Sequence, residues 1–344
     1  MPVIPVIGGP RERGRAAGRA LAPQLHRSLE FYRGFLDRRG LRTADLPGVL
    51  APYRSAAATV LPALLEEIEG MADGADVSFW ELFAANAWEE VEPTLATTST
   101  IERCTAFAVA GPNGTVVGHN ELWYAGDAGN TAVIAARPDQ GPAFVSPSVV
   151  TCLPAVGMNA AGTAQAIMSL SARDDGVGVP RVLVSRHALQ AEDPGDGRTR
   201  AAIPGRAGGY AHLFARSGGE VITVETSATG EAVVEGGAHT NHYLDPELAA
   251  GADAPEPGSA ARLERLRDLL ADRSPSTPTD VMEVLRDHHS SPAICLHPDS
   301  ADGDEAEAVL FSMVCHLEER RMWIADGVPC TAPFQEIDLA ATLG

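Results

Sequence analysis

The spacing of apolar residues changes at Cys104, and this change limits the folds that the chain can adopt. Before Cys104, apolar residues recur about every 3.6 positions, which predicts helices over residues 11–39 and 56–72 and a third helix that begins near Ser78. After Cys104, short β-prone runs alternate with clusters of Gly, Asn, Asp and Pro. Helices followed by strands indicate an α+β fold, because a parallel doubly wound fold alternates strands and helices along the whole chain.

The part of the chain after Cys104 is expected to form a mostly antiparallel sheet with inserted helices. Gly74 is expected to end the second helix of the earlier part. Strands are predicted at residues 105–110, 115–119, 131–136, 143–151, 163–170, 210–215, 220–226, 231–235, 307–316 and 321–326. One helix is predicted over residues 180–191, opened by Pro180, and others at residues 258–272 and 278–288. Exposed loops are predicted at residues 92–100 and 245–259.

Cys104 stands directly before a predicted β-hairpin, whose turn is supplied by residues 112–114. Single cysteines are most often buried as small hydrophobic residues. A thiol at the start of a strand, however, becomes the first residue of a new chain if the loop before it is cut. The new α-amino group then has a pKa of about 7.7–8.0 and can act as the base that activates the adjacent thiol.

The composition excludes several classes of function. The chain has 344 residues, enough for one large domain or two ordinary ones, and its net charge of −20 argues against nucleic acid or an anionic membrane as the main partner. Its five cysteines are widely spaced without a C-x-x-C pair, so a disulfide framework and a zinc ribbon are not expected. The first residues lack the apolar region of a signal peptide, which predicts a cytoplasmic protein with reduced thiols.

The segment HTNHYL, residues 239–244, raises the question of a metal site. His239 and His242 lie three residues apart, but no acidic or cysteine ligand accompanies them, so no metal is expected. Asn241 carries a neutral amide donor, which suits an oxyanion hole or, alternatively, a turn or cap.

Three further segments are interpreted as plain loops. The cluster at residues 174–176 lacks the alternating ligands of a calcium loop. The glycines at residues 205–209 do not follow a strand and open a helix, as a phosphate loop does. In SPAICLHPDS, residues 291–300, His297 and Asp299 belong to a strand end and its loop.

Taken in order, several segments resemble the isopenicillin-N acyltransferase family, a family of N-terminal-nucleophile (Ntn) cysteine enzymes. These segments are RCTAFAV, GHNELW, GMNAAG, GVPR, GRAGGY, HTNHYL and AICLH, and GPRERGRAAG and IEGMADGADVSFWEL resemble the family's N-terminal region. The resemblance covers most of the chain and implies a four-layer αββα fold of the α+β class. It also implies a precursor that cuts itself between Arg103 and Cys104. Residues 1–103 would then be a helical pro-segment and residues 104–344 the catalytic core, and the two chains would stay associated.

The resemblance also implies the chemistry of the site. Cys104 would form a thioester acyl-enzyme with a small-molecule amide or acyl thioester and pass the acyl group to water or an amine, in natural-product metabolism. Asn241 matches the family's oxyanion donor, and His119 and Asn120 are further catalytic candidates. The substrate-binding candidates are Glu121, Leu122, Trp123, His239, His242 and Leu296. No cofactor is implied.

Three positions depart from the family pattern. Arg103 replaces the glycine before the cysteine, Leu122 replaces the acid of a G-H-N-x-D segment, and Leu296 replaces the arginine of an S-I-C-R segment. Strand alternation is expected to turn Glu121 to the opposite face from that acid, which makes it a poor substitute unless a bulge intervenes. The replacements predict a remade pocket for a less charged substrate than the penicillin-forming relatives use.

Two alternatives remain open. In the first, the chain stays whole, and Cys104 is an internal thiol that His119 or a bound group activates for acyl transfer or cyclisation, or that only lines a ligand pocket. In the second, the protein is a metal-binding or interaction protein that uses His239, His242 and the acidic surface.

Overall fold

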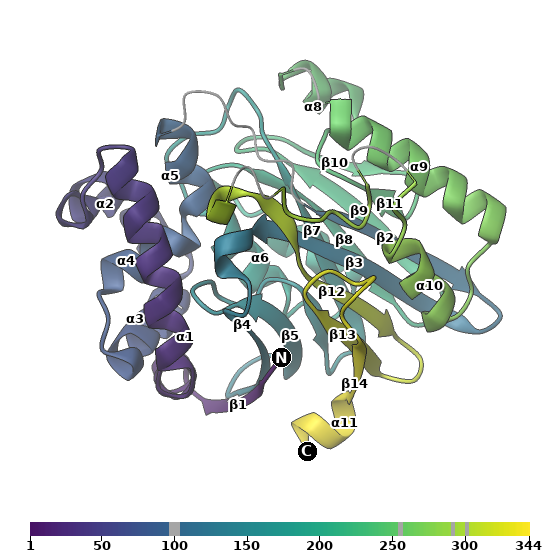
Figure 1. Cartoon of the computed structure of the whole chain (residues 1–344), viewed down its shortest axis with the longest axis horizontal. Coiled ribbons are helices and arrows are strands. Elements are labelled where there is room, and N and C mark those ends of the chain that lie inside the picture. Colours follow the sequence, from purple (N-terminus) through teal and green to yellow (C-terminus); the bar gives the residue numbers. More distant parts are fainter. Residues whose placement is uncertain (96–103, 254–256, 290–292, 300–302) are drawn as a thin grey trace.

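Two β-sheets lie face to face, with helices on their outer sides (Figure 1). The computed structural model describes residues 1–95, 104–253, 257–289, 293–299 and 303–344. The expected α+β class is confirmed. Among the described helices, none has both the length and the apolar character needed to cross a membrane.

The first sheet has eight strands in the order β1-β4-β5-β6-β7-β8-β9-β10. These strands are β1 (Val3–Gly8), β4 (Thr131–Pro138), β5 (Phe144–Val149), β6 (Gly157–Asn159), β7 (Thr163–Leu170), β8 (Gly209–Arg216), β9 (Glu220–Thr226) and β10 (Glu231–Val234). The sheet is antiparallel except where β1 pairs in parallel with β4. The strand β1 was not expected, because the first hundred residues were predicted to be helical.

The second sheet has six strands in the order β11-β2-β3-β12-β13-β14, all antiparallel. They are β2 (Thr105–Gly111), β3 (Gly114–Tyr124), β11 (Ala238–His239), β12 (Glu307–His316), β13 (Arg321–Asp326) and β14 (Phe334–Asp338). The predicted hairpin is confirmed as β2 and β3, but β3 runs past the expected end at residue 119. His119 and Trp123 therefore both lie within the strand.

Alternation along the strands creates separate hydrophobic cores on the two faces of the second sheet. Ala106 and Val117 belong to the large core that lies between the sheets. Phe107 and Val116 belong instead to the core that packs on helices α9 (Pro257–Arg273) and α10 (Pro278–Leu285). A third small core joins the outer face of the first sheet to helices α6 (Arg181–Ala188) and α7 (Pro194–Ala201). The order of layers is therefore helix, sheet, sheet, helix.

The N-terminal part forms a separate group of helices beside the sheets (Figure 1). These helices are α1 (Pro10–Arg38), α2 (Leu46–Val60), α3 (Pro62–Ala75), α4 (Phe79–Asn86) and α5 (Trp88–Leu95). Gly74 does not end a helix as expected but lies inside α3, because α1 and α3 cross there at very short range. A Cβ on Gly74 would lie 2.4 Å from the carbonyl oxygen of Arg15, and one on Gly14 would lie 1.9 Å from that of Glu67.

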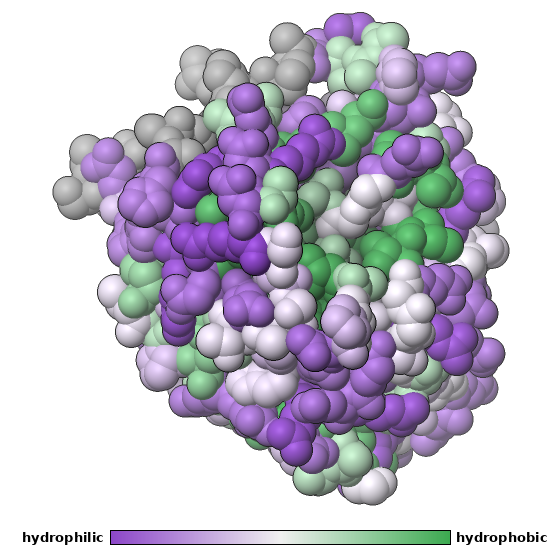
Figure 2. All heavy atoms as spheres, turned by 90° about the vertical axis from the view of Figure 1, so that its right-hand side faces the viewer, coloured by the Kyte–Doolittle hydropathy of each residue, from purple (hydrophilic) through white to green (hydrophobic). Residues whose placement is uncertain are grey.

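Short helices complete the chain. They are α8 (Pro246–Ala250), α11 (Leu339–Leu343) and the 3-10 turns η1 (Thr43–Asp45), η2 (Ala125–Asp127) and η3 (Gly303–Glu305). Two expected loops are partly wrong: Glu92 is buried in α5, and residues 246–250 form α8. Residues 96–100 of the first loop lie outside the described part. Figure 2 shows the face of the molecule that lies on the right-hand side of Figure 1. This face is largely hydrophilic, with a hydrophobic area near its middle.

Candidate active site

An apolar cavity lies between the two sheets, and Glu89 of α5 contributes to its wall. Its empty volume is about 560 Å³, including the open mouth. It is lined by Glu89, Cys104, Glu121, Trp123, Pro147, Ser148, Val149, Cys152, Leu153, Ala155, Val156, Ile167, Ser169, Val182, Tyr210 and Phe311. The cavity therefore presents a thiol and a few polar groups within an otherwise apolar wall.

Cys104 enters the cavity because of its place directly before β2. Ala106, two residues further along the chain, points into the space between the sheets. Because every second residue of a strand faces the same side, Cys104 points there as well. The side chain is buried, and the backbone has a φ of 91°, a conformation that residues other than glycine rarely adopt. Backbone strain of this kind tends to be held at functional sites by the surrounding structure.

Glu121 and His119 lie beside the thiol, on the same face of β3. Cys104 Sγ lies 3.4 Å from Glu121 Oε1, and Glu121 Oε2 lies 3.0 Å from His119 Nε2. Thr105 pairs with Asn120 across the hairpin, so Cys104 comes opposite Glu121. Alternation separates Glu121 from Leu122, as expected. Glu121, however, is the one of the two that faces Cys104, so the expectation that it is a poor substitute for the acid is wrong.

The thiol is held in its protonated form in the uncut chain. Burial, and then the negative charge of Glu121, raise the pKa of Cys104 well above its ordinary value. A nucleophilic Cys104 consequently needs a base beside it.

Arg262, on α9, joins Cys104 to Asn241. Its Nη1 donates to the Cys104 carbonyl oxygen at 3.0 Å, and its Nη2 donates to Asn241 Oδ1 at 3.0 Å. Asn241 Nδ2 in turn donates to the carbonyl oxygen of Ser169, which lines the cavity. Arg262 is almost completely buried, and the sequence analysis missed it. The only feature of the sequence that could have pointed to Arg262 is its place on the apolar face of the predicted helix, next to Leu263.

Glu89 brings the N-terminal part into the cavity wall. Its carboxylate accepts hydrogen bonds from Ser169 Oγ and from Tyr210 OH, the latter at 2.7 Å. The next residue, Glu90, is paired with buried Arg181 at 2.9 Å. Burial lowers the pKa of Arg181, but the charges of its carboxylate neighbours outweigh this effect and raise it overall. The described part of α5 is thus fixed on the first sheet, immediately before the residues that lead to Cys104.

The remaining predicted residues are divided between the cavity and its surroundings. Trp123 lines the cavity, and its Nε1 donates to Tyr32 OH at 2.6 Å. Asn120 points to the helix side of the sheet, where its Nδ2 donates to the carbonyl oxygens of Leu285 and Ile294, both at 3.0 Å. Seven predicted residues do not appear among the described lining residues: His119, Asn120, Leu122, His239, Asn241, His242 and Leu296.

The two histidines of HTNHYL are used in separate contacts. His239 pairs with Glu225 at 2.7 Å, and His242 bonds Ser259 Oγ at 2.8 Å. Burial lowers the pKa of His242 to about 4. Arg103, on the other side of the expected cut, lies outside the described residues.

Comparison with solved structures supports the fold. Penicillin V acylase from Agrobacterium tumefaciens is 16% identical, with 69% of this chain and 86% of that chain covered and a TM-score of 0.50. A mutant of conjugated bile acid hydrolase from Clostridium perfringens is 12% identical, with coverage of 70% and 94% and a TM-score of 0.46. The first of these likenesses shows the Ntn-hydrolase fold. A search of curated proteins finds no match.

A family match covers most of the chain after Cys104. Residues 109–329 match the family described as acyl-coenzyme A:6-aminopenicillanic acid acyl-transferase. The match begins five residues after Cys104 and therefore does not include the thiol. The resemblance noted in the sequence is confirmed, and the chain belongs to the acyl-coenzyme A:6-aminopenicillanic acid acyl-transferase family.

Proposed function

We propose that this protein is an Ntn-type acyltransferase or amidohydrolase whose nucleophile is Cys104. The observation that carries the proposal is a single arrangement: the thiol opens into an apolar cavity, while its own carbonyl is tied through Arg262 to Asn241. The substrate is a small-molecule amide or acyl thioester with an apolar acyl group. The mostly apolar wall favours such a group over a charged one.

The chain first cuts itself between Arg103 and Cys104. The thiol attacks the Arg103 carbonyl carbon, the peptide C–N bond breaks as its nitrogen takes a proton, and water then hydrolyses the resulting thioester. The strained φ of Cys104 supports this step, because breaking the bond releases the backbone constraint. The products are residues 1–103 and residues 104–344.

The new α-amino group of Cys104 then acts as the base. It takes the thiol proton, Sγ attacks the substrate carbonyl carbon, and the tetrahedral intermediate collapses as the amine or thiol leaves with a proton. Asn241 is proposed to donate a hydrogen bond to the oxyanion, and Glu121, paired with His119, is proposed to orient the nucleophile. Water or an amine then takes the acyl group from the thioester. We place this reaction in the metabolism of small natural products.

A second candidate is favoured by the Glu121–His119 pair. In the uncut chain these residues already lie at the thiol and could serve an internal Cys104 without any free amine. This version requires no cut, and the chain would transfer acyl groups, cyclise a substrate or only bind a ligand as one piece.

Intact-mass spectrometry of the wild type and Cys104→Ala separates the candidates. The Ntn proposal expects two fragments that meet at Arg103–Cys104 in the wild type and a single full-length mass in the variant. Both proteins are then assayed with a panel of N-acyl amides and acyl thioesters. A whole wild-type chain that is active only with Cys104 intact supports the second candidate, and full activity of Cys104→Ala would overturn both.

A further inference from the structure

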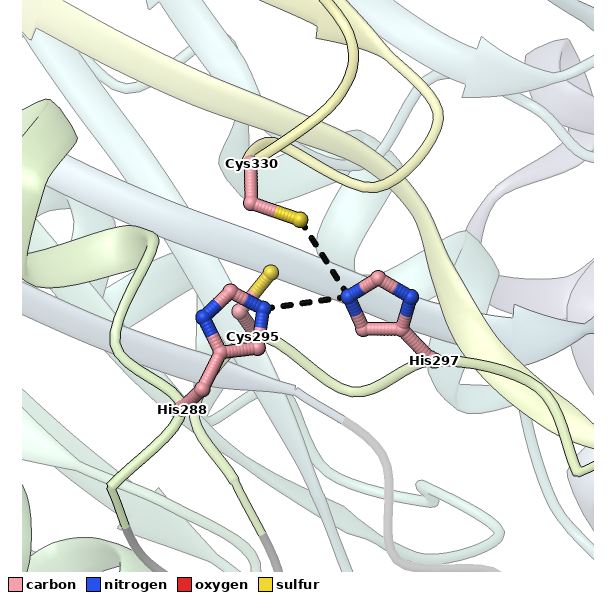
Figure 3. Close-up of side chains that lie close together, drawn as sticks. All are labelled: His288, Cys295, His297 and Cys330. Carbon is pink, nitrogen blue, oxygen red and sulfur yellow. Dashed lines mark hydrogen bonds between the residues drawn. The ribbon is translucent and has the colours of Figure 1, made fainter.

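Four potential metal ligands converge on the helix side of the second sheet, outside the cavity lining (Figure 3). His288 follows α10, Cys295 and His297 lie in the segment that leads towards β12, and Cys330 lies in the loop between β13 and β14. Their ligand atoms all lie within 4.8 Å of one another. Figure 3 shows all four side chains pointing to a common centre.

The distances are close to the edges of a tetrahedron around one ion. His288 Nε2 lies 3.0 Å from His297 Nε2, and Cys330 Sγ lies 3.2 Å from the same nitrogen. A zinc ion with ordinary Zn–N and Zn–S bonds separates two nitrogens by about 3.3 Å and a nitrogen from a sulfur by about 3.6 Å. The two measured pairs therefore need to move apart by only a few tenths of an ångström to bind it, and the remaining ligand atoms lie within 4.8 Å.

Two hydrogen bonds to backbone carbonyl oxygens already hold the ligand-bearing segments together. Arg286 Nε donates to the carbonyl oxygen of Pro329, next to Cys330, at 3.0 Å. The Cys295 amide donates to the carbonyl oxygen of Asp287, next to His288, at 3.0 Å. Three separate parts of the chain are thus in place without the ion.

The surrounding structure fixes these contacts further. The carboxylate of Asp287 accepts two hydrogen bonds from the Arg265 guanidinium, from Nε at 3.0 Å and from Nη2 at 2.7 Å. Asn120, on β3, bridges the end of α10 to Ile294, the residue before Cys295. The contact explains why a polar side chain is buried on this face of β3.

The donor set selects the kind of ion. Two thiolates and two imidazoles suit zinc, whereas magnesium and calcium prefer oxygen ligands. Two thiolates also balance the charge of a divalent ion. Four protein ligands fill every position of a tetrahedral site, which is typical of structural rather than catalytic zinc.

We propose that His288, Cys295, His297 and Cys330 bind one structural Zn²⁺ ion. The site departs from the expectation that the chain binds no metal, and it uses none of the histidines of HTNHYL. The ion cross-links the end of α10, the segment before β12 and the β13–β14 loop. Through Asn120 it supports β3, the strand that carries His119 and Glu121 on its other face.

The test uses the full chain, purified under reducing conditions, loaded with Zn²⁺ and freed of excess ion by gel filtration. Elemental analysis should find about one zinc per chain in the wild type and a stoichiometric loss in His288→Ala and Cys330→Ser. The matched control is His289→Ala, because His289 is exposed and adjacent to His288 but outside the cluster. A chelator should lower the melting temperature of the wild type and of the control, but not that of Cys330→Ser.

Cobalt(II) supplies a second readout that needs no variant. The wild type should show the visible bands of tetrahedral cobalt and a thiolate-to-cobalt charge-transfer band. A wild-type chain that holds no zinc, or His288→Ala that holds as much as the control, overturns the proposal. So does a Cys295–Cys330 disulfide in the zinc-loaded protein, or a cobalt spectrum without thiolate bands. The readouts are independent of the enzymatic activity, so they stand apart from the outcome for Cys104.

Discussion

At the scale of single residues, the protonated state of Cys104 is the main obstacle to its chemistry. Burial and the nearby carboxylate of Glu121 both disfavour the thiolate in the uncut chain. The proposed cut would place an amine beside this carboxylate, and the carboxylate would then hold a cation rather than repel an anion. Glu121 would thus disfavour the thiolate before the cut and stabilise the protonated α-amino group beside the thiolate after it.

Replacing Glu121 by Gln should separate these two effects. The pH profile of Cys104 alkylation should move to lower pH, because a negative charge 3.4 Å from Sγ is removed. Turnover should nevertheless fall, on the order of 100-fold, because the nucleophile loses its orienting partner. The measurements are peptide-resolved alkylation by iodoacetamide and steady-state kinetics.

The control for Glu121→Gln is Leu122→Met, which keeps the side-chain volume on the opposite face of β3 and should stay near the wild-type rate. Equal losses of turnover in the two variants would show that Glu121 has no special role on its face of β3.

Arg262→Lys should impair catalysis more than folding. A lysine has no planar fork and cannot donate at once to the Cys104 carbonyl and to Asn241 Oδ1. We expect kcat to fall by about 100-fold, the lower end of the loss seen on removal of an oxyanion donor, with little change in KM. Arg267→Lys, at an exposed position of α9, is the control. A change confined to KM would count against the proposed role.

At the scale of elements, η2 anchors the N-terminal helices to the second sheet through one buried carboxyl group. Asp127 accepts hydrogen bonds from Ser28 Oγ and from Tyr32 OH, both on α1. Burial raises the pKa of Asp127 from 3.8 to about 6, and the hydrogen bonds only partly oppose this shift. Between these two values the folded chain binds more protons than the unfolded chain.

The stability of this anchor should therefore fall as pH rises from about 4 to 6 and level off above 6. The comparison is the free energy of unfolding by urea for the wild type and Asp127→Asn. The difference should change by up to about 3 kcal/mol across this range, because one pKa unit corresponds to about 1.4 kcal/mol. Asp37→Asn, at an exposed position of α1, is the control. A difference between the wild type and Asp127→Asn that rises with pH would contradict the burial of a neutral carboxyl group.

At the scale of the whole molecule, the two proposed chains are held together by more than the bond between them. β1 is part of the eight-stranded sheet, and α5 is bound to Arg181 on the other side of the cut. Glu67, on α3, forms buried ion pairs with Arg13 at 2.7 Å and with Arg186 of α6 at 3.2 Å. Residues 1–103 should therefore stay bound to residues 104–344 after processing.

Glu67→Gln should weaken this association. The change leaves two buried guanidinium groups without their carboxylate, a defect that typically costs about 3–5 kcal/mol. We expect the fragments to co-elute in gel filtration of the wild type and to separate at lower urea concentration in the variant.

The control for Glu67→Gln is Glu69→Gln, which is also on α3. It removes a half-exposed pair with Arg11 of α1 and should cost at most about 1 kcal/mol. Similar urea midpoints for the two variants would show that the buried pairs do not hold the chains together.

Much of the fold could be predicted because it depends on local patterns. Local apolar periodicity and turn-forming residues are enough to predict the change at Cys104, the turn at residues 112–114 and most strand positions. Gly74 was misjudged because its role is set by α1, which packs on it from a distant part of the sequence. β1 was missed because a short strand at a sheet edge is stabilised by its partner β4.

The sequence by itself determined the α+β class, the place of Cys104 at the head of a hairpin and the family to which the chain belongs. Only the tertiary structure decided that Glu121 and not Leu122 faces the thiol, that Arg262 and Glu89 reach the cavity wall, and that four distant residues form a candidate metal site. The physical reason is the range of the interactions. Periodicity and turns are set by neighbouring residues, whereas the convergence of side chains is set by how distant strands and helices pair and pack.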